Sequence, residues 1–396
     1  MAGAVPEPFC LHLADEVLDD LRERLSRTRW PDEVPGSGWQ YGANRDFMRR
    51  LIEHWRDRFD WRAHEATLNT FDQFRVSIEG IDLHFVHQRG TGPDPLPLLL
   101  VHGWPGSVWE FHELIPRLTD PARFGGDPAD AFTVVAPSLP GFTLSFEPGQ
   151  PRLAIGEMAD LFAALMTDVL GYRRFAAQGG DWGAYVIARL AAAYPDRLRG
   201  IHLNLLPLRP GLPPPSEPSE EYRRYEEELR LWKTDEAGYS AIQGTKPQTL
   251  AYALTDSPAG LAAWIVEKFH TWTENWGDLE QWVDFDSLLT NITLYWATGA
   301  INSSFWPYYA IRHQPWPLPE ARIETPTAYA SFPRETRHPP RSLAKQAFNI
   351  QRWTAMPRGG HFAALEVPDL LAADIVAFFR LMRESWLHAQ PGVRPR

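Results

Sequence analysis

Cysteine, long apolar runs and clustered positive charge are all scarce in this chain of 396 residues. The single cysteine, Cys10, excludes an intrachain disulfide and any metal cluster built on cysteine ligands. No stretch of about 18 apolar residues occurs, so we expect no membrane-spanning helix. Residues 1–8 lack a basic start followed by an apolar core, which argues against a signal peptide. A cytoplasmic enzyme is therefore the expectation.

The charge balance is acidic, with a formal net charge of −11 and no long basic run. Nucleic acid and anionic membrane surfaces are therefore poor partners. The hydrophobic fraction of 44% and the charged fraction of 22% are typical of a soluble globular protein. The length allows either one large domain with insertions or two domains.

Solid apolar runs alternate with helical patterns along much of the chain. Such runs are typical of strands that are buried on both faces of a parallel sheet. We expect strands at 96–101, 132–136, 175–177, 201–205, 327–331 and 349–354. We expect a hairpin at 74–78 and 81–86, and helices at 155–170, 184–193 and 368–386. Strands that alternate with helices predict a parallel α/β sheet.

Two other segments do not fit this alternation. Near the N-terminus, 15–28 and a second stretch capped by Asn44 have the spacing of amphipathic helices, whose apolar faces must pack elsewhere. Between 206 and 319 the strand runs disappear, and a proline-rich linker leads into helical, aromatic sequence. We therefore divide the chain into an N-terminal meander with the first hairpin, the first part of the core, a helical lid and the second part of the core, with bounds 1–92, 93–205, 206–319 and 320–396.

The pentapeptide Gly179-Gly180-Asp181-Trp182-Gly183 lies between an expected strand and an expected helix. Strand, tight turn and helix form the context of a nucleophile elbow, and the glycines let the backbone bend and pack closely. The central residue is usually Ser in hydrolases of this layout, but here it is Asp181. By itself the pentapeptide is equally compatible with a glycine-rich turn and an Asp helix cap.

Two more motifs follow other expected strands, namely the loop that begins at His102 and the Gly-rich loop that contains His361. Sites in open parallel sheets form at the carboxyl ends of the strands, so these loops should meet Asp181. A carboxylate with a pKa of about 3.9 is ionised at neutral pH and can attack an sp³ carbon to form an ester. His361 can then deprotonate water to hydrolyse the ester, if a carboxylate stabilises the imidazolium. Epoxides and haloalkanes suit this chemistry better than esters or amides.

These motifs resemble the signatures of microsomal-type epoxide hydrolases. The resemblance covers nearly the whole chain, and it implies an α/β-hydrolase fold with a mostly parallel central sheet, flanking helices, a helical lid and an N-terminal meander. It rests on residues 29–32, 38–42, 102–107, 180–183, 243–247, 288–291 and 358–364. The membrane-bound members carry an N-terminal anchor, which this chain lacks, so it resembles a soluble, microbial member.

The resemblance implies that Asp181 is the nucleophile and His361 the base. The acid position matches Glu335, with Glu324 as a weaker rival. The alternative for Glu335 is an ordinary exposed loop carboxylate.

Two lid tyrosines donate protons to the epoxide oxygen in this family, and Tyr239 and Tyr308 match them. Tyr309 adjoins the second, where the local sequence departs from relatives. The backbone N–H groups of Trp104 and Trp182 are the expected oxyanion hole. The same two tyrosines and two tryptophans are the expected substrate-binding residues, whereas His102 is expected to be a structural hydrogen-bonding residue.

The lid segment is crowded with aromatic side chains. They are Trp264, Phe269, Trp272, Trp276, Trp282, Phe285, Tyr295, Trp296, Phe305, Trp306 and Trp316. They either shape a pocket for a bulky apolar epoxide or simply pack the lid on the core. The expected partners are therefore an apolar epoxide and water, without a metal or other cofactor, and a homodimer is one open option for the assembly.

Two other functions remain open at this point. A haloalkane dehalogenase also uses an Asp nucleophile followed by Trp, although Trp104 stands where such enzymes usually have Asn or Glu. An alkoxide leaving group needs a proton, which phenols supply better than indoles. A catalytically silent α/β-hydrolase that serves as a binding protein is the third reading, and the intact set of Asp181, Glu335 and His361 argues against it.

Overall fold

The computed structural model describes residues 4–214, 217–275 and 277–389. Within these ranges one sheet of nine strands has the order β1-β2-β3-β5-β4-β6-β7-β8-β9. The strands are β1 (Glu7–Phe9), β2 (Gln73–Ile78), β3 (Ile81–Gln88), β4 (Leu96–Val101), β5 (Phe132–Pro137), β6 (Phe175–Gly179), β7 (Leu198–Leu203), β8 (Ile323–Ser331) and β9 (Phe348–Ala355). The pairs β1–β2, β2–β3 and β3–β5 are antiparallel. The remaining pairs, from β5 through β4, β6, β7 and β8 to β9, are parallel. The expected parallel α/β core is confirmed.

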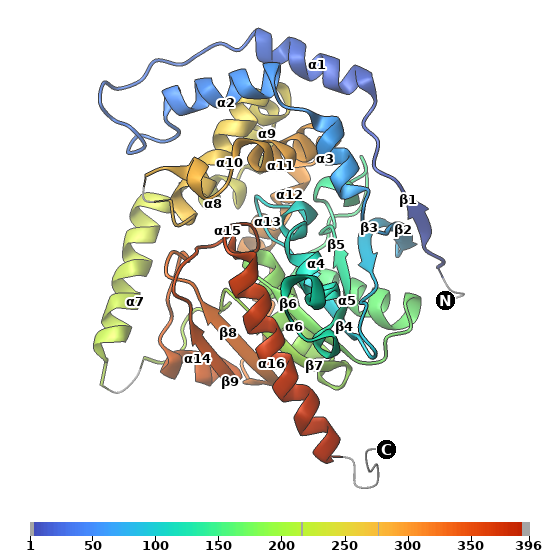
Figure 1. Cartoon of the computed structure of the whole chain (residues 1–396). Helices are drawn as coiled ribbons and strands as arrows, with labels where there is room; N and C mark the ends of the chain where they lie inside the picture. The colour runs from blue at the N-terminus through green and yellow to red at the C-terminus, as the bar shows by residue number, and fades with distance from the viewer. Residues whose placement is uncertain (1–3, 215–216, 276, 390–396) are drawn as a thin grey trace.

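Helices cover both faces of this sheet and form a separate layer above one end of it (Figure 1). The helices are α1 (Asp15–Ser26), α2 (Arg45–Asp57), α3 (Trp61–Leu68), α4 (Leu114–Thr119), α5 (Ile155–Ala164), α6 (Asp181–Ala193), α7 (Glu220–Leu231), α8 (Gly238–Gln243), α9 (Pro247–Asp256), α10 (Pro258–Trp272), α11 (Phe285–Thr298), α12 (Ile301–Ser304), α13 (Trp306–His313), α14 (Arg341–Ala347), α15 (Ala363–Glu366) and α16 (Pro368–Ala389). None of the helices in the described ranges is long and apolar enough to cross a bilayer.

Alternate residues of the central strands face two different helix layers. In β4, Leu98 and Leu100 belong to an apolar cluster that includes residues of α4 and α16. Leu99 and Val101 belong to a second cluster, with residues of α5 and α6. Side chains alternate between the two faces of a strand, so a strand covered on both faces must be apolar throughout. This packing explains the solid apolar run in the sequence.

The helical insertion lies between β7 and β8. Helices α7 to α13 form it, and the described residues within 206–319 contain no strand. The insertion covers the sheet at the ends of β6 and β9, which precede the elbow at 179–183 and the loop that contains His361 (Figure 1). One aromatic residue of the crowded set, Trp276, lies outside the described residues.

The N-terminal helices pack on this insertion, which supplies the partner that their apolar faces require. In Figure 1, α1 and α2 lie across α9, α10 and α11. The buried indole of Trp55, on α2, donates a hydrogen bond to Thr293 Oγ1 of α11 at 3.1 Å. The expected cap is present, because Asn44 Oδ1 accepts a hydrogen bond from the N–H of Phe47 at 2.8 Å.

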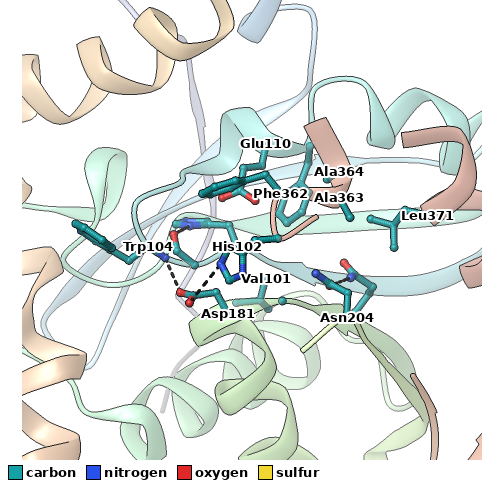
Figure 2. Close-up of a pocket in the computed structure, with 15 residues that line it drawn as sticks. Val101, His102, Trp104, Glu110, Asp181, Asn204, Phe362, Ala363, Ala364 and Leu371 are labelled. Carbon is teal, nitrogen blue, oxygen red and sulfur yellow. Dashed lines mark hydrogen bonds and ion pairs between the residues drawn. The ribbon is translucent and has the colours of Figure 1, made fainter. Parts of the chain in front are cut away.

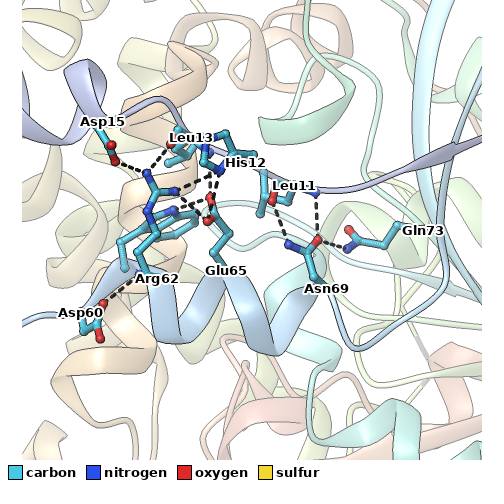
Figure 3. A network of polar contacts seen from close by, with 10 residues as sticks. Leu11, His12, Leu13, Asp15, Asp60, Arg62, Glu65, Asn69 and Gln73 are labelled. Carbon is cyan, nitrogen blue, oxygen red and sulfur yellow. Dashed lines mark hydrogen bonds and ion pairs between the residues drawn. The ribbon is translucent and has the colours of Figure 1, made fainter.

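Polar contacts fasten α3 to the extended segment that precedes α1 (Figure 3). The carboxylate of Glu65 accepts a hydrogen bond from the Leu13 N–H at 2.7 Å, and Asn69 Oδ1 accepts one from the Leu11 N–H at 2.8 Å. Arg62 bridges Glu65 and the carbonyl of Leu13. These bonds satisfy backbone groups that no sheet partner reaches, so the extended segment holds its place.

Some element bounds differ from the expected ones. Helix α6 begins at Asp181 instead of residue 184, because the elbow itself forms the first turn. Strand β7 spans 198–203 instead of 201–205, and β8 begins at Ile323, four residues before the apolar run. In β8 the polar Thr325 and the imino acid Pro326 hid the first half of the strand.

Candidate active site

Asp181 lies on the tight turn between β6 and α6. Its φ angle of 43° is in the left-handed region, which is uncommon for a residue with a side chain. The turn is compact, since a Cβ at Gly183 would lie 2.0 Å from the carbonyl oxygen of Val101. Close approach of α6 to β4 thus requires glycine at this position. The strained turn presents the carboxylate at the carboxyl end of the sheet, as in a nucleophile elbow.

The two oxygens of the Asp181 carboxylate face different groups. Oδ1 accepts a hydrogen bond from the Trp104 N–H at 2.7 Å, and Oδ2 lies 3.5 Å from Nε2 of His361. The Trp182 N–H lies in the first turn of α6, where helical N–H groups have no partner within the helix. One oxygen is therefore held by a backbone donor, while the other is left for chemistry.

Glu335 lies behind the imidazole of His361. Its Oε1 is 2.8 Å from Nδ1 of the histidine, and it also accepts hydrogen bonds from the N–H and hydroxyl of Thr336 at 2.6 and 3.0 Å. Both side chains are buried. The rival carboxylate Glu324 is exposed and pairs with Arg322. The structure thus brings together Asp181, His361 and Glu335, from three separate loops.

The charges of Asp181 and Glu335 determine the protonation state of the imidazole of His361. Burial by itself lowers the pKa of His361, but the carboxylates of Glu335 and Asp181 outweigh burial and raise this pKa well above its ordinary value. Burial opposes ionisation of Glu335 as well, yet the neighbouring imidazole and the two Thr336 donors lower the pKa of this carboxyl. The imidazole is therefore positively charged between two anions.

A cavity of about 140 Å³, counted as the space open to the centre of a water molecule, lies on the lid side of Asp181 and His361. Both tyrosines of the sequence prediction line it, Tyr239 from α8 and Tyr308 from α13. Its walls are mostly aromatic and aliphatic, with Trp182, Tyr185, Leu205, Trp232, Trp272 and Ile311, and it also contains Ser240, Thr336 and Arg337.

Aromatic contacts fix the two tyrosines over the nucleophile. The ring of Tyr239 is stacked on Trp104 at 5.4 Å, and the ring of Tyr308 meets Trp182 edge-on at 4.7 Å. The hydroxyl of Tyr308 is buried and has no hydrogen-bond partner among the described residues. Tyr309 instead stacks on His313, away from the cavity.

Both phenols keep their protons at neutral pH. Burial, and then the charge of Asp181, raises the pKa of Tyr239 well above 10. Burial raises the pKa of Tyr308 as well, followed by the charges of Tyr239 and Asp181. Two proton donors therefore face a carboxylate across one cavity.

A second, smaller cavity also borders Asp181 and His361, and residues of β4 and of the loop after it line it (Figure 2). Its volume is about 20 Å³ in the same measure, enough for one water molecule. In Figure 2, Glu110 and Phe362 lie opposite Asp181 across this space. Removal from water, together with the charge of Asp181, raises the pKa of Glu110 to about 8, although the imidazolium of His361 opposes the shift.

Sequence reasoning missed Glu110, Arg337 and a half-buried carboxyl beside the loop that contains His361, Glu366. The last accepts hydrogen bonds from the N–H groups of Phe362 and Glu274 at 3.0 and 2.9 Å, and so joins the loop to the end of α10. Glu110 follows the 102–107 motif closely, and that proximity was the one available signal. No spacing pattern marks Arg337 or Glu366.

The remaining expectations have different outcomes. His102 is a structural residue as expected, because its Nε2 accepts a hydrogen bond from the Leu139 N–H at 3.0 Å and burial lowers its pKa to about 4. Of the crowded lid aromatics, Trp272 lines the larger cavity. Others dock the lid, since Phe269 stacks on Phe362 at 3.9 Å.

The chain is similar to known proteins along nearly its whole length. A model described as "Epoxide hydrolase N terminus" matches residues 6–111, and one described as "alpha/beta hydrolase fold" matches residues 97–244. Epoxide hydrolase 1 of Oryctolagus cuniculus is 38% identical over 413 residues, which cover 96% of this chain and 89% of the relative.

Two solved structures share the fold. The juvenile hormone epoxide hydrolase of the silkworm Bombyx mori superposes with a TM-score of 0.87 at 30% identity, covering 97% of this chain and 96% of the other. The epoxide hydrolase of Aspergillus niger gives a TM-score of 0.83 at 30% identity, with coverages of 96% and 97%.

Proposed function

The chain belongs to the epoxide hydrolase family, and from that premise we propose that it converts an epoxide to a vicinal diol through an ester on Asp181. The observation that carries this proposal is the position of His361, 3.5 Å from a carboxylate oxygen of Asp181 and 2.8 Å from one of Glu335. A nucleophile that needs no activation, followed by a base with a carboxylate partner, is what alkylation and hydrolysis require in turn.

In the first step, Oδ2 of Asp181 attacks a ring carbon, and the bond from that carbon to the epoxide oxygen breaks. Oδ1 stays on the Trp104 N–H and becomes the carbonyl oxygen of the ester. The epoxide oxygen takes a proton from Tyr239 or Tyr308, which line the same cavity. A developing alkoxide is a far better acceptor than the neutral epoxide, so the phenols act most strongly in the transition state.

In the second step, the imidazolium of His361 first gives its proton to the phenolate that the first step left, and the neutral imidazole then takes a proton from water. The resulting hydroxide adds to the ester carbon of Asp181. Alkylation prepares this step, because it removes one of the two negative charges that raise the pKa of the imidazole. The charge that forms on Oδ1 is stabilised by the Trp104 N–H and, we propose, by the Trp182 N–H. The bond between the ester carbon and Oδ2 then breaks, and Oδ2 takes the proton of the newly formed carboxyl group and leaves in the diol. Asp181 is again a carboxylate, His361 keeps the other proton of the water, and the phenol is intact.

We place the attacking water in the small cavity beside Glu110. The cavity borders both Asp181 and His361, and it has room for one molecule. With a pKa of about 8, the Glu110 carboxyl is mostly neutral at pH 7, so it can both donate to and accept from water. The epoxide and the water thus have separate cavities, which both border Asp181 and His361.

The larger cavity suits an apolar epoxide body. We propose that 206–319 acts as the lid that closes it, and that its aromatic walls favour aryl or alkyl substituents over small polar ones. Each buried methylene contributes about 0.8 kcal/mol. Styrene oxide should therefore be hydrolysed more efficiently than glycidol, and a preference for glycidol would contradict an apolar pocket.

A single-turnover reaction in water labelled with heavy oxygen tests the ester. With enzyme in excess over styrene oxide, the first diol should carry unlabelled oxygen from Asp181, and label should appear in diol from later turnovers. A fully labelled diol in the first turnover would show direct attack by water. The Asp181→Asn variant is the control, since it should form neither ester nor diol.

Haloalkane dehalogenation is the second activity to be measured. The indole N–H groups of Trp104 and Trp182 are buried without acceptors among the described residues, and such donors can bind halide. Halide release from 1-bromo-2-phenylethane, followed beside diol formation from styrene oxide, separates the two. We expect diol without halide, because Tyr239 and Tyr308 supply the proton that only an oxygen leaving group needs.

A further inference from the structure

The cavity that we assign to the substrate contains one strongly basic side chain. Arg337 lies on the loop between β8 and α14, two residues after Glu335, and lines the cavity together with Asp181. Its guanidinium carbon lies 5.0 Å from the ring centre of Trp232, another wall residue. The phenol of Tyr185, also in the wall, is close enough to interact with it. The positive charge is therefore at the cavity and not on the outer surface.

No carboxylate pairs with this guanidinium in the ranges that the structure describes. No acidic oxygen lies within 4.0 Å of it, and its Nε is buried without a hydrogen-bond partner. The charged or titratable groups around it are Tyr185, Tyr225, Tyr239 and Glu335, and the carboxylate of Glu335 is already bonded to His361. An arginine is always charged, and buried charges in proteins are ordinarily paired.

Lys268, on the same lid, shows the ordinary arrangement. Its ammonium group is buried near the rings of Tyr239 and Trp272, and it has two carboxylate partners, Glu236 at 3.2 Å and Glu267 at 2.6 Å. The lid therefore neutralises one buried cation completely. The cation in the cavity wall is left without the partner that Lys268 has.

We propose that Arg337 binds a carboxylate of the substrate, so that the preferred substrates are epoxy acids with the acid group remote from the oxirane. The carboxylate cannot be next to the oxirane, because Asp181 would repel it. Tyr185 and Tyr239 line the cavity together with Asp181 and Arg337, so a substrate that reaches from one charge to the other lies beside these rings. A guanidinium matches a carboxylate with two parallel hydrogen bonds, which an ammonium cannot do. This inference rests on the proposed function.

The alternative is that Arg337 only stacks the lid on the core through Trp232. The two roles predict different effects of substitution. A purely structural residue would affect all epoxides alike, whereas a carboxylate-binding residue would affect the acid and spare its ester.

The test compares ω-epoxy fatty acids of several chain lengths with their methyl esters. We expect the wild-type kcat/KM to favour the acid by about tenfold at the best length, as for one charged hydrogen-bonded contact. Arg337→Met should remove this preference, mainly through KM, with a clearly larger loss for the acid than for the ester or styrene oxide. Arg337→Lys should restore part of the preference. Arg358→Met, which removes an exposed charge, is the control for net charge.

A direct measurement of binding tests the proposal even if Arg337→Met folds poorly. Calorimetry with a saturated fatty acid, which cannot react, should show binding to the wild type that is weaker in Arg337→Lys and about tenfold weaker for the matching alcohol. Preference for the ester at every length, or an equal loss for acid and ester in Arg337→Met, would overturn the proposal. If the wild type opened no epoxide at all, the proposed function would fail; turnover of styrene oxide without acid preference would refute this inference alone.

Discussion

Replacement of Glu335 by Gln tests whether the buried carboxylate acts on the hydrolytic step. Glu335 Oε1 accepts hydrogen bonds from Thr336 N, Thr336 Oγ1 and His361 Nδ1. Gln keeps the shape and one acceptor oxygen, and it loses the charge. The amide also brings an NH₂ group to the position of Oε2, which is buried without a partner. The change therefore removes the electrostatic support of the imidazolium while the geometry is kept.

The magnitude follows from the kind of hydrogen bond that is lost. Hydrogen bonds to charged groups are worth about 1.5–3 kcal/mol, and neutral ones about 0.5–1.5 kcal/mol. The imidazolium that forms when His361 deprotonates water should thus lose about 1–2 kcal/mol of stabilisation. At about 1.36 kcal/mol for each factor of ten, ester hydrolysis should slow about 5- to 30-fold. Alkylation of Asp181 should change much less, because the carboxylate attacks without a base.

Rapid quenching followed by mass spectrometry of the intact protein measures the two steps separately. In Glu335→Gln, the alkylated fraction should rise at steady state while the first-order rate of its decay falls. Glu324→Gln is the matched control, since Glu324 is an exposed carboxylate on β8 that pairs only with Arg322, and both rates should be those of the parent. Equal slowing of both steps, or an unchanged decay rate with an unchanged adduct, would refute the reasoning.

Three further outcomes are expected. His361→Gln should alkylate at Asp181 and stop there, so that mass spectrometry shows one stable adduct; a variant that binds substrate and forms no adduct would contradict the role. Tyr239→Phe and Tyr308→Phe should each slow alkylation about 10- to 100-fold, as loss of a hydrogen bond to a charged oxygen implies, and the double variant should nearly abolish it; parental rates in both single variants would remove the assignment. Because the folded pKa of Glu110 is about 8, above its ordinary value, the folded state holds a proton that the unfolded chain releases, so this group makes stability fall as the pH rises from about 5 to 8. Thermal unfolding of Glu110→Gln should show a smaller loss over that range, and an identical slope would exclude the shift.

The core strands could be predicted because burial on both faces determines the composition of each strand's own residues. Parallel strands with helices on both faces need uninterrupted apolar sequence, and the run at 96–101 coincides with β4. The cap at Asn44 was predictable for the same reason, since its partner is three residues away. Short or polar elements escaped notice: β1 has three residues at the sheet edge, and the first half of β8 contains Thr325 and Pro326.

The candidate site likewise contains residues that the local sequence marks and residues that only the fold brings together. Asp181 and His361 stand out in the sequence because their glycine-rich turns are required by the backbone geometry. Glu110 and Arg337 do not, since each becomes significant only through neighbours that the fold brings from other strands and from the lid. Likewise, the apolar stripe of 45–57 predicted that this helix needs a partner, and nothing in its spacing could name the lid as that partner.

That partner connects the N-terminal region to the candidate site. Helix α11 lies between the meander and the loop at 102–107. On one side, Trp55 donates a hydrogen bond to Thr293. On the other, Nδ2 of Asn291 donates one to the carbonyl of Pro105 at 2.8 Å. The N–H of Trp104, one residue before that proline, is the donor to Asp181. We therefore expect a movement of the lid's aromatic wall to disturb that donor. Because preorganised donors lower the barrier more than mobile ones, we also expect this fastening of the lid to favour the proposed reaction.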